Sequence, residues 1–153
     1  MILEAPNTGD LAQGWAEATL PSGVTGYAVF RQSVPGRADQ EAVVPLTLES
    51  SQVADLTYDD TLLTTSVAFL NPSAQQALVT ITTYASDGSQ TGSSQVALAP
   101  RSKQAAILRN LPGLAGVIGN RGWATFTVSS GAISALGLRS SAQAFTSIPV
   151  TLR

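Results

Sequence analysis

The sequence predicts an all-β fold, an antiparallel β-sandwich of about nine to ten strands. Short runs of alternating apolar and polar residues are broken by turn signals roughly every ten residues, which is the spacing of a sandwich or barrel. Charged residues make up only 12% of the 153 residues, whereas serine and threonine number 33. Hydroxyl groups suit a pleated surface better than they suit a long surface helix. In addition, a segment near the start of the chain recurs near its end.

The repeat relates residues 14–33 (GWAEATLPSGVTGYAVFRQS) to residues 122–141 (GWATFTVSSGAISALGLRSS), with eight identities in twenty ungapped positions. Both copies continue into a similar proline step, Val44-Pro45-Leu46 and Ile148-Pro149-Val150. Each copy contains a short loop ending in glycine, which predicts a three-residue hairpin turn. The repeat therefore predicts two equivalent hairpins, related by a pseudo-twofold axis within one sandwich.

The predicted strands follow the alternation along the chain, at 14–20, 24–32, 41–46, 61–70, 76–85, 93–99, 103–109, 122–128, 132–139 and 145–150. Asn71-Pro72-Ser73 ends one strand, and Ser86-Asp87-Gly88 turns another. Residues 109–120 lack alternation and contain Pro112 and three glycines, which indicates a helical turn or an ordered crossover loop. We expect residues 1–13 to form an N-terminal tail or edge segment, and residues 14–153 to form a single sandwich domain.

The alternation places both tryptophans on the more polar face of their hairpins. Trp15 lies diagonally across from Arg31, and Trp123 lies diagonally across from Arg139. A guanidinium group resting on an exposed indole contributes roughly 0.5–1 kcal/mol. These four residues are the candidate contact site for a sugar ring or a partner protein. The alternative is a structural clasp, which the presence of the pair in both copies favours.

Composition argues against most catalytic chemistry. The chain has no cysteine and no histidine, which excludes disulfides, thiol nucleophiles and histidine bases. The acidic segment Asp55–Asp60 could offer carboxylates to calcium, but it lacks the spacing of a calcium loop, and a solvated turn is the preferred interpretation. Ser102 and Lys103 are adjacent in a strand, so their side chains point to opposite faces. We predict no cofactor, no metal site and no enzymatic activity.

Charge and hydropathy limit the partners. The net charge is −2, and the eight basic residues are scattered, which argues against nucleic acid and against an anionic membrane surface. No run of residues is long and apolar enough to span a bilayer. The expected partners are protein, either a second copy or a neighbouring domain, or polysaccharide.

Several motifs together resemble an immunoglobulin-like β-sandwich module of large secreted or surface-attached bacterial proteins. They are the GWA-x-x-T hairpin, the strand Thr65–Pro72, the Asp87-Gly88 turn, and the closing Leu138-Arg139 with Phe145–Pro149. The resemblance covers about residues 12–152, and its motifs mark turns and strands. It implies an extracellular or cell-surface location and brings no catalytic residues.

The favoured function is a non-catalytic extracellular module for adhesion, binding, or matrix and surface display. Two alternatives stay open. The chain could be a self-assembling structural subunit of a filament or surface layer that uses edge-strand or N-terminal strand pairing. It could also be a carbohydrate-binding module that uses Trp15 and Trp123. A hydrolase with paired carboxylates ranks last.

Overall fold

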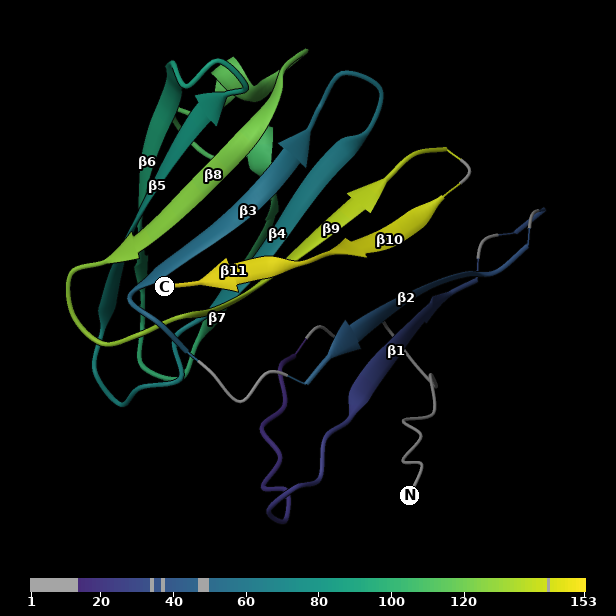
Figure 1. Ribbon diagram of the computed structural model, residues 1–153, viewed down its shortest axis with the longest axis vertical. Helices are drawn as coiled ribbons and strands as arrows, with labels where there is room; N and C mark the ends of the chain where they lie inside the picture. Colours follow the sequence, from purple (N-terminus) through teal and green to yellow (C-terminus); the bar gives the residue numbers. More distant parts are fainter. Residues whose placement is uncertain (1–13, 34, 37, 47–49, 143) are drawn as a thin grey trace.

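The protein is an all-β, antiparallel sandwich, as the sequence predicts. The computed structural model describes residues 14–33, 35–36, 38–46, 50–142 and 144–153. Two facing sheets form the sandwich, and a separate two-stranded hairpin lies beside it (Figure 1). The predicted tail at residues 1–13 lies outside the described residues.

The larger sheet has five strands in the order β11-β3-β8-β5-β6. The strands are β11 (Val150–Leu152), β3 (Val53–Asp59), β8 (Arg121–Val128), β5 (Ala77–Ala85) and β6 (Gln90–Leu98). All neighbours pair antiparallel. This sheet therefore draws its strands from both halves of the sandwich sequence.

The smaller sheet has four strands in the order β10-β9-β4-β7. They are β10 (Phe145–Ile148), β9 (Ser134–Ser140), β4 (Thr64–Leu70) and β7 (Lys103–Ile107). Between β7 and β8 the chain makes two short 3₁₀ turns, η1 (Leu108–Asn110) and η2 (Ala115–Val117). This is the predicted helical-turn crossover in residues 109–120.

The core lies between the two sheets. Phe69 of β4 and Phe126 of β8 meet there with ring centroids 5.6 Å apart and planes tilted by 54°. Tilted aromatic pairs at this distance are favourable because the edge of one ring faces the π-face of the other. The other large, fully buried apolar side chains come from β3 and β5, the 3₁₀ turns and the β8–β9 connection: Tyr58, Leu56, Ile81, Val79, Leu108, Leu114, Val117 and Ile133.

One central strand was not predicted. β3 occupies Val53–Asp59, where the sequence had suggested a solvated acidic turn. Ala54, Leu56 and Tyr58 face the core, and Asp55, Thr57 and Asp59 face outward. The acidic residues therefore follow the period of two of a half-buried strand and do not form a loop.

The second copy of the repeat is not a hairpin. β8 lies in the five-stranded sheet and β9 lies in the four-stranded sheet, so the loop after Val128 carries the chain from one layer to the other. The inward positions are Ile133, just before β9, and Ala135 and Gly137 on β9, opposite to the face expected from hairpin register. A one-residue change of register reverses both faces of a strand, which explains the error.

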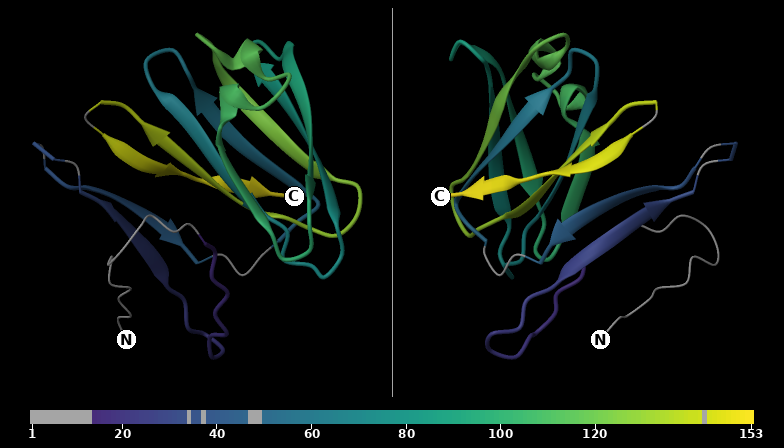
Figure 2. Two further views of the ribbon diagram at one scale, coloured as in Figure 1. Left: turned by 180° about the vertical axis from the view of Figure 1, so that it is seen from behind. Right: turned by 45° about the vertical axis from the view of Figure 1, so that its right-hand side comes forward.

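The first copy differs again. Residues 14–20 form no strand, and the predicted strand at 24–32 is shortened to β1 (Tyr27–Gln32). β1 pairs with β2 (Gln40–Pro45) as an isolated two-stranded sheet. This hairpin lies along β10 and projects from the sandwich (Figure 2), and the Ser147 hydroxyl donates to the Val43 carbonyl at 2.6 Å.

Candidate functional site

Trp123 lies on the outer face of the five-stranded sheet, where it stacks on Tyr84. The ring centroids are 5.1 Å apart and the planes differ by 16°. The two residues are directly opposite in the β5–β8 register. Both are half-buried, so the pair presents a partly covered aromatic surface at one end of the sheet.

Hydroxyl groups continue this outer face beyond the aromatic pair. Thr82 pairs with Thr125, and Thr80 pairs with Thr127, in the same register. The Thr125 hydroxyl donates to Asp55 Oδ1 at 2.7 Å. Aromatic and hydroxyl side chains thus line the outer face of β8 and β5, and the charged pairs of Asp55 and Asp59 border them on β3.

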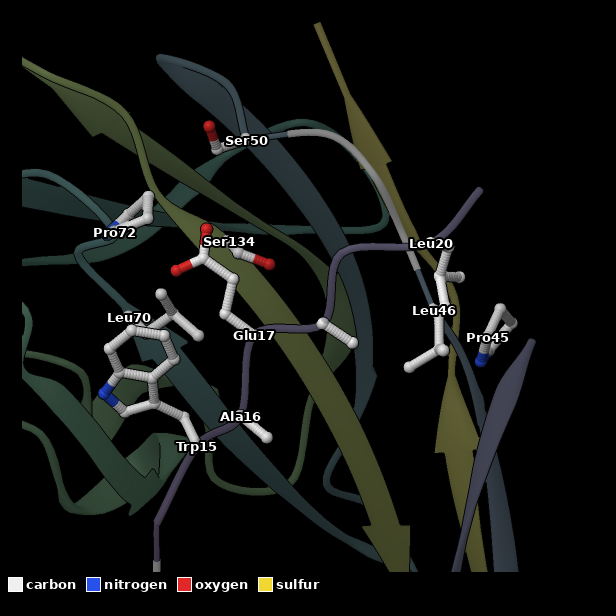
Figure 3. A pocket seen from close by; sticks show the side chains of 11 residues that line it. Trp15, Ala16, Glu17, Leu20, Pro45, Leu46, Ser50, Leu70, Pro72 and Ser134 are labelled. Carbon is white, nitrogen blue, oxygen red and sulfur yellow. The ribbon is translucent and has the colours of Figure 1, made fainter. Parts of the chain in front are cut away.

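Trp15 occupies a different environment. Its ring lines a hollow of about 350 Å³ between the N-terminal segment and the sandwich (Figure 3). Leu70, Pro72 and Ser134 line the sandwich side of the hollow, and Glu17 lies on the same segment as Trp15. Trp15 Nε1 donates to the Arg101 carbonyl at 3.1 Å, and Arg101 forms an ion pair with Glu17 at 3.0 Å.

The contacts between the N-terminal segment and Arg101 are exposed, because the side chains of Glu17 and Arg101 are 69% and 55% accessible. Exposed ion pairs of this kind contribute about 0–1 kcal/mol. Arg101 sits in the turn between β6 and β7, with a positive φ of 55°. The segment therefore rests on the sandwich through weak polar contacts at one turn.

The predicted diagonal pairs of tryptophan and arginine do not form. Trp15 and Arg31 are not cross-strand neighbours, because residues 14–20 are not a strand, and Arg31 instead forms an ion pair with Glu41 at 2.8 Å. Trp123 and Arg139 lie in different sheets. The four candidate residues thus do not form two equivalent platforms, and Tyr84 takes the place beside Trp123 that was assigned to Arg139.

The acidic residues near β3 each have a separate partner. Asp55 pairs with Arg153 at 2.7 Å, and Asp60 pairs with Arg109 at 2.9 Å. Asp59 accepts hydrogen bonds from the Thr61 amide at 3.0 Å and the Thr61 hydroxyl at 2.6 Å. These two hydrogen bonds hold the pKa of Asp59 below its usual value, and the positive charges of Arg121 and Arg139 act in the same direction.

Among the described residues, no three aspartates and glutamates gather closely enough to hold a metal ion. Within the same part of the chain, no helix has the length and apolarity needed to cross a membrane.

An exposed apolar face on hairpin β1–β2 was missed by the sequence interpretation. Its members alternate along both strands and share one side of the hairpin: Tyr27 and Val29 from β1, with Val43 and Pro45 from β2. Tyr27 is 68% exposed and Val29 is 51% exposed. The available signal was that residues 24–32 carry apolar side chains on both faces, which exceeds what one core-facing strand needs.

Compared with known proteins, the chain matches no family model, no curated protein and no solved structure. We therefore infer function from the geometry of two surfaces, the exposed face of hairpin β1–β2 and the Trp123–Tyr84 pair.

Proposed function

We propose that this chain is a non-catalytic structural module of a secreted or surface-attached bacterial protein, and that it joins neighbouring protein through hairpin β1–β2. Its role is adhesion, or display and matrix formation at the cell surface. The observation that carries the proposal is the outward apolar face of this hairpin, with Tyr27, Val29 and Val43 accessible. Elsewhere in the sandwich, large apolar side chains are mostly buried between the sheets.

The physical reason is the cost of leaving such a face in water. Burying apolar surface yields about 25 cal/mol per Å², and contiguous exposed apolar patches mark interaction sites. The face belongs to a two-stranded hairpin, and an isolated hairpin of this size is marginally stable. A partner that covers the outward face would stabilise the hairpin and complete the module.

Sedimentation velocity over a concentration series tests this proposal. The wild-type chain should self-associate as concentration rises, because the uncovered face contacts other copies. The double variant Val29→Thr/Val43→Thr keeps side-chain shape and strand propensity but makes the face polar. It should associate at least about tenfold more weakly, with an unchanged melting temperature.

Leu78→Thr is the matched control, because Leu78 is exposed on the five-stranded sheet, away from the hairpin. It should associate like the wild type. A wild-type chain that stays monomeric throughout, or an equal loss of association in Leu78→Thr, would count against the proposal.

Glycan binding is the second candidate function, favoured by the stacked Trp123–Tyr84 pair next to the threonine pairs. Flat aromatic rings pack against the apolar faces of sugars, and neighbouring hydroxyl groups hydrogen-bond to sugar hydroxyls. In this candidate the platform is the outer face of the five-stranded sheet, and Trp15 plays no part in it.

Tryptophan fluorescence separates the two tryptophans. In Trp15→Phe, all tryptophan emission comes from Trp123, and a saturable change with one soluble polysaccharide would support this candidate. Trp123→Phe leaves Trp15 as the reporter and should show no change. Indifference of the Trp15→Phe variant to every polysaccharide would rule the platform out.

A further inference from the structure

The Gly-Trp-Ala motif of the second copy is explained by its neighbours. A Cβ atom at Gly122 would collide with the Tyr84 carbonyl oxygen. Trp123 stacks on the Tyr84 ring, and Ala124 is fully buried in the core. Each residue of the motif is thus suited to a strand that pairs closely with a neighbouring strand, as β8 pairs with β5.

The first copy carries the same motif without those neighbours. A Cβ atom at Gly14 would meet nothing within 4 Å, and Ala16 is exposed. Trp15 stacks on no other ring among the described residues. The motif therefore has the composition of a strand inside a sheet, but no strand among the described residues pairs with it.

The strand that follows shows the same contrast. β1 aligns without a gap on β9, so that Tyr27, Val29 and Arg31 correspond to Ala135, Gly137 and Arg139. On β9 these positions face the sandwich interior: Gly137 is buried against Leu56, and the Nε atom of Arg139 is shielded from solvent. On β1 the corresponding positions face solvent.

The match extends past the hairpin. After the longer loop of the first copy, Pro45, Thr47 and Leu48 align with Pro149, Thr151 and Leu152. The sequence from residue 14 to residue 48 thus reproduces, in order, the part of the chain that closes the sandwich.

We propose that the segment at residues 14–20 and hairpin β1–β2 close a second sandwich, in which the outward face of β1 is covered by a half-sandwich equivalent to residues 50–120. A neighbouring protein supplies this half. The inference rests on the proposed function and names its partner. A second copy of this chain is the less suitable source, because its own residues 50–120 are already closed by β9 and β10.

The covering half has a defined shape at one position. A Cβ atom at Gly137 would collide with Leu56 Cδ1, and the first copy has Val29 at the corresponding position. A leucine at the equivalent of Leu56 would therefore clash with Val29. Valine is larger than glycine by three carbons, and leucine is larger than alanine by three carbons, so alanine at that position conserves volume.

The experiment extends the full chain at its N-terminal side. Residues 50–120 carrying Leu56→Ala are fused to the N-terminus of the full chain, residues 1–153, and backbone hydrogen exchange and tryptophan emission are measured. We expect amide exchange in β1 and β2 to slow by at least about 100-fold, because opening them then requires opening a sandwich. Trp15 emission should shift to the blue, and the calorimetric enthalpy of unfolding should rise about twofold.

Two matched fusions test the shape argument. The fusion with unmodified Leu56 should protect the hairpin at least about tenfold less than the Leu56→Ala fusion, because of the clash with Val29. Adding Val29→Gly to the unmodified fusion recreates the Gly137–Leu56 pair and should restore protection. Equal protection with and without Leu56→Ala would overturn the size assignment.

Failure of the inference is separable from failure of the proposed function. If the added half stays unfolded or leaves β1 and β2 unprotected in all three fusions, the inference is overturned. If the wild-type chain nevertheless self-associates through Val29 and Val43, the hairpin still serves as a joining element and the proposed function stands. If that association is also absent, both proposals fail.

Discussion

Residues 14–46 and residues 121–152 carry related sequences in contrasting surroundings. In the later region, β8 lies between β3 and β5, β9 lies between β10 and β4, and the apolar side chains of β8 enter the core. In the earlier region, residues 14–20 form no strand, and β1 exposes its apolar side chains. The difference shows that strand propensity and alternation are realised only where partner strands are present to complete the ladder.

The largest expected contrast lies between two phenylalanines. Phe126 is fully buried and contacts Phe69, whereas Phe30 is 49% exposed on the hairpin. Phe126→Ala should lower the free energy of unfolding by about 3–5 kcal/mol, because it removes buried area and leaves a cavity. Phe30→Ala should cost less than about 1 kcal/mol. Urea titrations followed by circular dichroism measure both, and similar costs would contradict the contrast.

Two ion pairs give the next contrast. The Asp60 side chain is 1% exposed, and Arg109→Met would leave its carboxylate without a cation, at a cost of about 3 kcal/mol. The Arg31–Glu41 pair lies in solvent, so Arg31→Met should change the free energy of unfolding by less than about 1 kcal/mol. Thermal unfolding of the two variants measures both costs. If both variants lose the same stability, the two ion pairs do not differ as their burial implies.

The two glycines of the repeated motif form a third test. Gly122→Ala forces a methyl group against the Tyr84 carbonyl and should cost at least about 1–3 kcal/mol. Gly14→Ala meets open space and should stay within about 0.5 kcal/mol of the wild type. Denaturant midpoints measured side by side provide the readout. A neutral Gly122→Ala would mean that β5 and β8 are not held as closely as the structure places them.

The smallest effect concerns pH. The Thr61 hydroxyl and amide bonds hold the pKa of Asp59 below its usual value of 3.8, so the native state favours the ionised carboxylate. The resulting stability is present above the unfolded-state pKa and is lost as pH falls through the lower folded-state pKa. Asp59→Asn should reduce the loss of stability on acidification, measured by urea unfolding at several acidic pH values. If the free energy of unfolding of Asp59→Asn falls with decreasing pH as steeply as that of the wild type, Asp59 makes no such contribution.

Much of the fold was predictable from local signals. The alternation located most strands of the sandwich, and the placement of Trp123 on an outer face is confirmed. β3 was missed because Asp55, Asp59 and Asp60 suggested a solvated turn, although the core-facing Ala54, Leu56 and Tyr58 already carried the strand period. Charged residues are compatible with a strand when they occupy its solvent face.

The remaining differences arise from non-local pairing. Glycine-containing turn residues after Val128 do not determine whether the next strand stays in the same sheet, and here it crosses to the other layer. The stacking of Trp123 on Tyr84 depends on the β5–β8 register, which joins strands far apart in sequence. The spacing of residues within one hairpin could not indicate this stacking. The exposure of the apolar face of β1 likewise depends on which distant strands lie beside it.

Hairpin β1–β2 is a marginal element attached to a cooperative sandwich. Native-state hydrogen exchange on the full chain measures this difference, because it reports the opening free energy of each strand separately. We expect the amides of β3, β5 and β8 to exchange only through global unfolding, and the amides of β1 and β2 to exchange orders of magnitude faster. If β1–β2 and β9–β10 were equally protected, the hairpin would instead be an integral part of this sandwich.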